Sequence, residues 1–65
     1  MDINVGECLR VAQARKNVSN RELATRMDKS EQQISRWRSQ RDLRIQRVEE
    51  LCEALKMDIK EFLSG

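Results

Sequence analysis

The stretch from Val18 to Arg38 constrains the fold most, because its pattern predicts two short helices separated by a tight turn. Its apolar residues form two groups, Leu23, Ala24 and Met27, then Ile34 and Trp37. Gaps of one, three and four residues place each group on one face of a helix. The residues between them are polar, so each helix is expected to bury one face and expose the other.

Three helix starts in the chain share one side-chain signal. Ser19 is followed by Glu22, Ser30 by Gln33, and Asp58 by Glu61. In such a capping box the first side chain accepts a hydrogen bond from the backbone N–H three residues on, and the second side chain bonds back to the cap residue. The apolar pairs Val18 with Leu23 and Met57 with Phe62 occupy the positions of a hydrophobic staple. The three boxes predict where three of the helices begin.

The rest of the chain is also patterned as helix. It has no proline, only two glycines, and no alternation of β-branched with polar residues that would indicate a strand. A helix is expected over about 5–16, capped by Asp2 or Asn4, in which Gly6 weakens the first turn so that the N-terminus frays. Another is expected over about 45–56, after a polar, basic linker at 39–44.

The inward faces of these two helices follow from spacing. The expected inner residues are Cys8, Leu9 and Ala12 in the first, and Val48, Leu51, Cys52 and Leu55 in the second. The sequence therefore predicts an all-α fold of five helices, with residues 1–65 as a single domain.

Composition disfavours an enzyme. A chain of 65 residues with two aromatic side chains buries only about 60% of its unfolded surface, too little for a core and a deep pocket together. It has no histidine and no Cys-x-x-Cys pair, so we expect neither a metal nor a cofactor, and no small-molecule substrate. Cys8 and Cys52 lie among apolar residues, which favours buried free thiols and a cytoplasmic location. No apolar run approaches the roughly 18 residues of a membrane span.

Charge is unevenly distributed along the chain. Residues 29–47 carry six basic and two acidic side chains, whereas residues 48–65 carry two basic and five acidic ones. Five arginines fall between positions 36 and 47. A basic block beside two short helices indicates a polyanion partner, although a solvated charged surface is the alternative interpretation.

These residues together resemble the Cro/CI-type (XRE) helix-turn-helix family of phage and bacterial regulators. The resemblance rests on Val18-Ser19, Glu22-Leu23-Ala24, Ser30, Ile34-Ser35-Arg36-Trp37, Leu51, Ala54-Leu55 and 58–63. It implies a compact five-helix, lambda-repressor-like DNA-binding domain, with the helix-turn-helix at the second and third helices, that binds operator DNA as a pair of subunits. The segment 28–37 also resembles phage activators of the CII type.

The chain departs from the family pattern at three places. Where the family usually has glycine in the turn, this chain has Met27 or Asp28, and aspartate tolerates the left-handed conformation better than most residues. Where the family often has an acidic residue and then glycine after the tryptophan, it has Arg38, Ser39 and Gln40. Where the family often has glutamine at the start of the second helix, it has the shorter Asn20.

The candidate base contacts lie in the third helix, whose N-terminal residues enter the major groove in this docking geometry. They are Gln32, Gln33, Arg36, Glu31 and Ser35. Glutamine can bridge N6 and N7 of adenine, arginine can bridge O6 and N7 of guanine, and glutamate can accept from cytosine N4. The alternatives are that Gln33 serves only as a cap, that Glu31 only complements the helix N-terminus, and that the others are solvated surface.

The candidate phosphate contacts flank this helix. They are Asn20, Arg38, Arg41 and Arg44, with a surface ion pair such as Arg44 with Glu49 or Asp42 as the alternative. Trp37 could stack on a base, but its position on the inner face favours the core.

The predicted protein is a sequence-specific DNA-binding regulator, most like a phage Cro-type repressor. Its expected partner is double-stranded operator DNA, bound as a homodimer that is weak or absent in free solution, with half-sites one helical turn apart. Met57, Ile59, Phe62 and Leu63 are expected to divide between the core and a two-fold contact. The alternatives left open are an activator or antitoxin-like regulator of the same fold, and a small helical protein-interaction module that uses the acidic C-terminal third.

Overall fold

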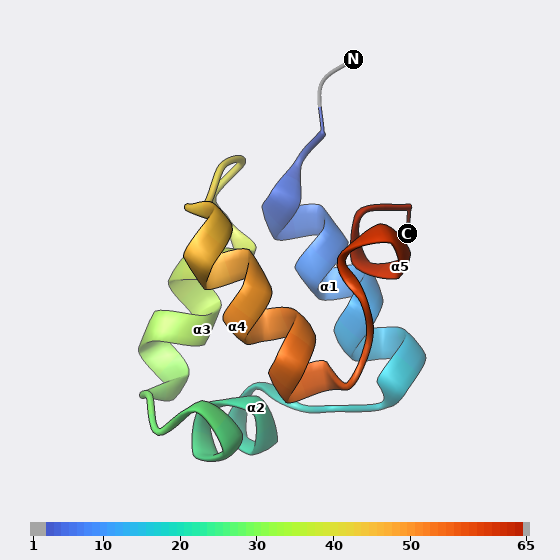
Figure 1. The fold of residues 1–65 in the computed structure, drawn as a ribbon. Helices are drawn as coiled ribbons and strands as arrows, with labels where there is room; N and C mark the ends of the chain where they lie inside the picture. The colour runs from blue at the N-terminus through green and yellow to red at the C-terminus, as the bar shows by residue number, and fades with distance from the viewer. Residues whose placement is uncertain (1–2, 65) are drawn as a thin grey trace.

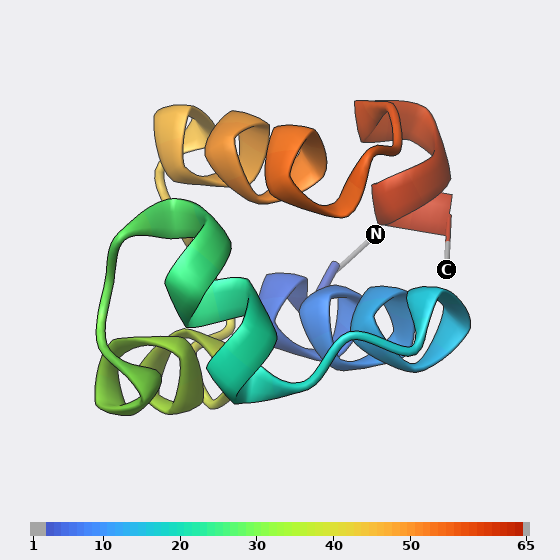
Figure 2. The same ribbon diagram turned by 90° about the horizontal axis from the view of Figure 1, so that it is seen from below.

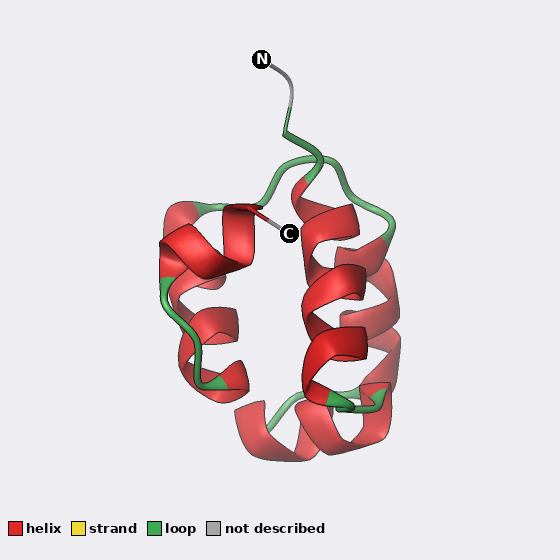
Figure 3. Cartoon of the chain, turned by 90° about the vertical axis from the view of Figure 1, so that its right-hand side faces the viewer, coloured by secondary structure: helices red, strands yellow, loops and turns green. Residues whose placement is uncertain are grey.

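The computed structural model describes residues 3–64, which form five helices joined by short turns (Figure 1). The helices are α1 (Val5–Lys16), α2 (Asn20–Met27), α3 (Glu31–Arg38), α4 (Ile45–Leu55) and α5 (Ile59–Ser64). The described residues include no strand (Figure 3). The predicted all-α, five-helix fold is therefore confirmed.

Two helices, α1 and α4, each contact three others. Helix α1 contacts α3, α4 and α5, while α2 contacts α3 and α4. Seen from below in Figure 2, α4 and α1 lie in two layers, and α2 crosses between them at one end. The pair α2 and α3 thus forms one end of the molecule, where α2 packs against α4 and α3 packs against α1.

Every helix contributes to the core. Leu9, Leu23, Ile34, Leu51 and Phe62, one from each helix, are completely buried. The predicted inner faces of α1 and α4 are confirmed, since all seven of their expected inner residues are buried. Met57 and Phe62 also lie in the core, and Ile59 and Leu63 pack partly buried against it. Met57 and Phe62 are therefore not available for a two-fold contact, whereas Ile59 and Leu63 keep part of their surface exposed.

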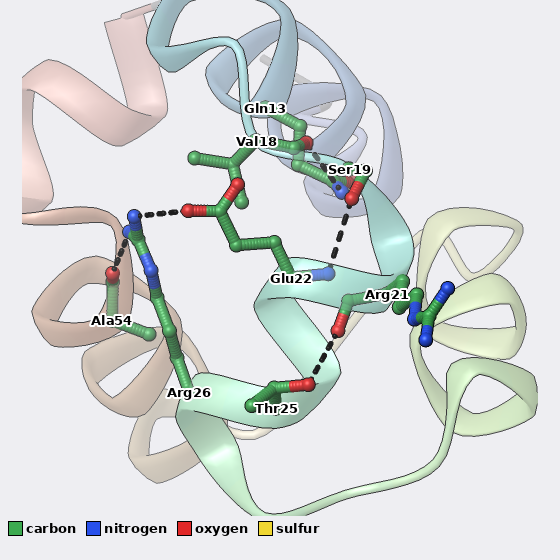
Figure 4. Close-up of polar contacts among 8 residues, drawn as sticks. All are labelled: Gln13, Val18, Ser19, Arg21, Glu22, Thr25, Arg26 and Ala54. Carbon is green, nitrogen blue, oxygen red and sulfur yellow. Dashed lines mark hydrogen bonds and ion pairs between the residues drawn. The ribbon is translucent and has the colours of Figure 1, made fainter.

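The helix starts follow their predicted caps, but only the capping box at α3 is complete in residues 3–64, because no bond from the Asp58 N–H to the Glu61 carboxylate is formed at α5. Asn4 accepts from the Glu7 N–H at 3.0 Å; Asp2, the other expected cap, lies outside the described residues. Ser30 and Gln33 form a complete capping box, and Asp58 accepts from the Glu61 N–H at 2.7 Å. Ser19 accepts from the Glu22 N–H at 3.1 Å, but the Glu22 carboxylate turns to Arg26 instead of returning a bond (Figure 4). The box at α2 is therefore only half formed.

Three helices end without glycine. Asn17, Asp28 and Lys56 adopt the left-handed conformation, with φ of 56°, 58° and 57°. Asparagine and aspartate tolerate this geometry because their short polar side chains bond locally. Asp28, not Met27, is thus the turn residue between α2 and α3. Lys56 ends α4 one residue earlier than the sequence predicts.

Gly6 has a packing role that its low helix propensity does not predict. The Gly6 N–H donates to the carbonyl oxygen of Gln40 at 2.9 Å, and the Val5 N–H to that of Arg41 at 2.8 Å. A Cβ atom on Gly6 would lie 2.6 Å from the Arg38 carbonyl oxygen and closer still to that of Gln40. Glycine is needed here because two backbone segments approach each other closely, so the first turn of α1 is fixed to the linker that follows α3.

Candidate nucleic-acid interface

A polar ridge runs along the outer side of α3. Ile34 and Trp37 are buried, with 0% and 7% of their surface exposed, and they turn the opposite side of this short helix to solvent. The exposed side chains are Glu31, Gln32, Ser35 and Arg36, which we call the α3 ridge. Gln32 and Arg36 are four residues apart, so they lie one above the other on the same face. Four of the five predicted base contacts are therefore brought together on one surface.

Gln33, the fifth predicted base contact, is half-buried and takes part in the cap of α3. Its Oε1 accepts from the Ser30 N–H at 3.1 Å, and its own N–H donates to the Ser30 hydroxyl oxygen at 3.2 Å. A glutamine that bridges adenine needs both its amide oxygen and its amide nitrogen. With the oxygen occupied by the cap, only the Nε2 group of Gln33 remains to donate to a base.

Bonds at the C-terminal end of α2 hold the helix pair in place. At the turn, the Lys29 N–H donates to the Ala24 carbonyl oxygen at 2.9 Å. On the other side, Arg26 donates to the Ala54 carbonyl oxygen of α4 at 2.9 Å and to Glu22 at 2.7 Å (Figure 4). The orientation of α3 is therefore set by the rest of the fold, as a rigid reading element requires.

Asn20 and Arg38, two of the predicted phosphate contacts, lie together where α2 begins and α3 ends. Arg38 Nη1 donates to Asn20 Oδ1 at 2.7 Å and to Gln13 Oε1 at 3.1 Å. Gln13 Nε2 in turn donates to Asn20 Oδ1 at 3.0 Å and to the Val18 carbonyl oxygen at 3.2 Å, the last of these visible in Figure 4. This cluster, which we call the α2 amide cluster, joins α1, α2 and α3.

Arg41 and Arg44, the other two predicted phosphate contacts, are exposed in the segment between α3 and α4. The ion pairs found in residues 3–64 are those of Arg26 with Glu22 and Arg47 with Glu50. The alternative pairing of Arg44 with Glu49 or Asp42 is therefore not formed. Both guanidinium groups are left facing solvent near the C-terminal end of α3.

Trp37 belongs to the core, as its position on the inner face predicts. Its ring is covered by Arg47, whose guanidinium carbon lies 4.3 Å from the ring centroid. A cation over an aromatic face is favourable, and here it joins α3 to the first turns of α4. The indole is thus not available for stacking on a base.

Gln13 and Gly6 are structural determinants of this interface that the sequence analysis missed. Gln13 has only 3% of its surface exposed, the one buried polar side chain in the part of the chain described. It stands four residues after Leu9, on the apolar face of α1. A glutamine at that position signals a buried polar group that needs partners.

Both thiols of the described residues lie in the core. Cys8 and Cys52 are free and buried. Burial raises the pKa of both thiols, and nearby carboxylates raise it further, Glu7 for Cys8 and Asp58 and Glu49 for Cys52. Nowhere in 3–64 do three or more metal-ligating side chains gather. Within the same range, no helix combines the length and the apolar character needed to cross a membrane.

Comparison with known families yields one match. A family model described as a Cro/C1-type HTH DNA-binding domain matches residues 9–64. The matched range contains α2 to α5 in full and most of α1. Searches of curated proteins and of solved structures gave no match.

Proposed function

The chain belongs to the Cro/C1-type helix-turn-helix family of DNA-binding domains, and from this premise we propose that it is a sequence-specific transcriptional regulator. Its partner is double-stranded operator DNA, and its closest functional analogue is a phage or prophage Cro-type repressor. In this role α3 enters the major groove, and the bound protein blocks RNA polymerase. The proposed function needs no cofactor and no catalysis, and it places the protein in the cytoplasm.

The observation that carries the proposal is the α3 ridge. It presents an amide, a hydroxyl, a carboxylate and a guanidinium on one exposed surface, and the major groove is wide enough, at about 12 Å, to admit a helix. Gln32 is assigned to adenine and Arg36 to guanine, each by paired hydrogen bonds. Glu31, Ser35 and the Nε2 group of Gln33 are assigned supporting contacts to neighbouring base edges.

The phosphate contacts are assigned to the two ends of the helix pair. Arg41 and Arg44 lie exposed in the segment that follows α3, and Asn20 opens α2. Such contacts give affinity and register but carry no sequence information directly. Arg38, which donates to Asn20, belongs to the same set.

We also propose that two subunits pair on the operator. Among residues 3–64, the exposed large hydrophobic side chains are Ile3, 43% exposed, and Ile45, 60% exposed. Both line one shallow groove together with Leu43 and Leu63. A patch of this kind supports a contact between subunits on DNA, and its small size supports a homodimer that is weak or absent in free solution.

The acidic residues of the C-terminal third favour a second candidate. Glu49, Glu50, Glu53, Asp58 and Glu61 are all exposed, so they can serve a protein partner. An activator or an antitoxin-like regulator would use this surface in addition to DNA. A protein-interaction module would use it instead of DNA.

Binding to a pool of random-sequence duplexes at low salt separates these functions. A regulator is retained and elutes as salt rises, because phosphate contacts are salt-dependent, whereas the interaction module flows through. Selection and sequencing of the retained duplexes then gives the half-site, its symmetry and its spacing. Half-sites about one helical turn apart support the paired repressor; a pool that remains random contradicts sequence-specific binding.

A further inference from the structure

Arg38 fixes the orientation of the Asn20 amide. A guanidinium has only hydrogen-bond donors, so the amide atom that faces it at 2.7 Å must be the oxygen. The same reasoning places the oxygen of Gln13 toward Arg38 at 3.1 Å. With Asn20 Oδ1 turned inward to Arg38, its Nδ2 group must point the other way.

Gln13 reinforces this orientation. Its Nε2 group donates to Asn20 Oδ1 at 3.0 Å, so that oxygen receives two hydrogen bonds. Rotating the Asn20 amide by half a turn would set its NH₂ group against two donors and leave Gln13, which is almost completely buried, short of an acceptor. Unpaired buried donors are costly, so the α2 amide cluster has one favoured arrangement.

The outward group of Asn20 is a free donor at a helix start. Its Nδ2 makes no hydrogen bond within residues 3–64, and the structure leaves no buried side-chain nitrogen or oxygen there without a partner. The Nδ2 group is therefore exposed to solvent, at the first residue of α2. A donor in this place lies beside the unpaired backbone N–H groups of the helix, a combination that favours an anion.

We propose that Arg38 is a positioning residue that acts on DNA through Asn20. It holds the asparagine amide so that Nδ2 donates to a backbone phosphate, and its own charge is not the main phosphate ligand. The proposal rests on the proposed function, and it assigns a role to the arginine that stands where related domains often have an acidic residue. It gives Arg38 a different role from Arg41, which is assigned a direct phosphate contact, although both belong to the same basic block.

A double-mutant cycle tests this assignment, with a pool of random-sequence duplexes as the probe. Arg38→Met, which keeps the aliphatic stem, and Asn20→Ala are each expected to lower affinity about tenfold, the effect of one hydrogen bond to a charged group. If Arg38 acts through Asn20, the DNA affinity of the double variant also falls about tenfold, and not the hundredfold that two independent contacts would give. Arg41→Ala is the matched control: it should lessen the salt slope by about one unit, whereas Arg38→Met leaves the slope nearly unchanged.

A spectroscopic measurement distinguishes positioning from general structural support. In the free protein, the side-chain NH₂ resonances of Asn20 should be dispersed and should shift on addition of duplex. In Arg38→Met they should move to the positions of a freely rotating amide while the backbone spectrum of α2 and α3 is retained. Asn20→Asp provides a second variant, because its carboxylate still accepts from Arg38 and Gln13: the melting temperature is kept while DNA affinity falls.

Two results would overturn the proposal. Additive losses in the cycle, together with a slope that falls by one unit in Arg38→Met, would make Arg38 a direct phosphate ligand. Asn20 NH₂ resonances that stay unchanged on DNA binding would show that Nδ2 does not donate to a phosphate. Failure of the proposed function looks different, because the wild-type protein and the Arg41→Ala control would then both fail to bind the pool.

Discussion

The backbone N–H of Gly6 donates to the carbonyl oxygen of Gln40 over 2.9 Å, and this bond joins the first turn of α1 to the linker that follows α3. Beside it, the Val5 N–H donates to the Arg41 carbonyl oxygen, so two backbone hydrogen bonds join these segments. The exposed arginines of this linker are candidate phosphate contacts, so the glycine holds part of the proposed interface in place although it lies outside the helix pair α2 and α3.

Gly6→Ala is expected to destabilise the protein by about 1–3 kcal/mol, the usual cost of overpacking. Helix propensity alone predicts the opposite sign, a gain of about 0.5–1 kcal/mol. Urea unfolding followed by circular dichroism measures the difference. Gln46→Ala, an exposed position in the first turn of α4, is the control and should stay within about 0.5 kcal/mol; a stabilised Gly6→Ala variant would contradict the close approach.

The two atoms of the Gln33 amide can be tested separately. Gln33→Glu keeps an oxygen that accepts from the Ser30 N–H, so stability should change by less than about 0.5 kcal/mol, with the new charge favourable at the helix start. DNA affinity should fall, because the Nε2 donor is gone and a carboxylate faces the groove. Ser30→Ala removes the hydroxyl oxygen that accepts from the Gln33 N–H and should cost about 1 kcal/mol of stability. Thermal melting and gel-shift titration of both variants check this split; equal affinity for wild type and Gln33→Glu would leave Gln33 as a cap only.

Gln32 and Arg41 should respond differently to replacement by alanine. Gln32→Ala is expected to cost about 1–3 kcal/mol on the best site and to relax preference at one base pair. Arg41→Ala should weaken binding to all sequences alike and lessen the salt slope by about one unit. Gel-shift titrations on the selected duplex and on a scrambled duplex, at several salt concentrations, measure both effects. An Arg41→Ala variant with altered base preference would reverse the two assignments.

The buried thiols predict a loss of stability in alkaline solution. Burial, with neighbouring carboxylates, raises the pKa of Cys8 and Cys52 above the ordinary value of 9.0. The unfolded chain therefore loses these protons first, so the stabilisation is fully present below about pH 9 and is lost as the pH rises toward the folded-state values. Chemical denaturation from pH 7 to pH 10 measures this decline, and the variant with both cysteines replaced by alanine should show a shallower one. An identical slope in that variant would assign the decline to other groups.

Most of the fold could be predicted because its signals are local. Ser30 with Gln33 identifies the start of α3 within four residues of sequence, and the spacing of Ile34 and Trp37 identifies its buried side. The turn position could be narrowed to Met27 or Asp28, and aspartate is the one of the two whose short polar side chain tolerates a positive φ. These features depend on neighbours along the chain, which the sequence displays directly.

The features that escaped prediction depend on contacts between distant segments. The close approach at Gly6 involves residues more than thirty positions away, and the inward turn of Arg38 depends on amides from α1 and α2. A sequence pattern places Arg38 on a polar face but does not show which partners lie beside it. The exposure of Gln32 and Arg36 was easier to predict, because the exposed side of a single helix follows from periodicity alone.

The most direct test of α3 as the DNA-reading helix is a titration of the ¹⁵N-labelled chain with the duplex recovered by selection, followed by NMR. If α3 reads the DNA, the amide and side-chain resonances of Gln32 to Arg36 shift most, together with those at the start of α2. The acidic residues of α4 and α5 should change little. If the resonances of α4 and α5 shift while those of α3 stay in place, α3 is not the element that reads DNA.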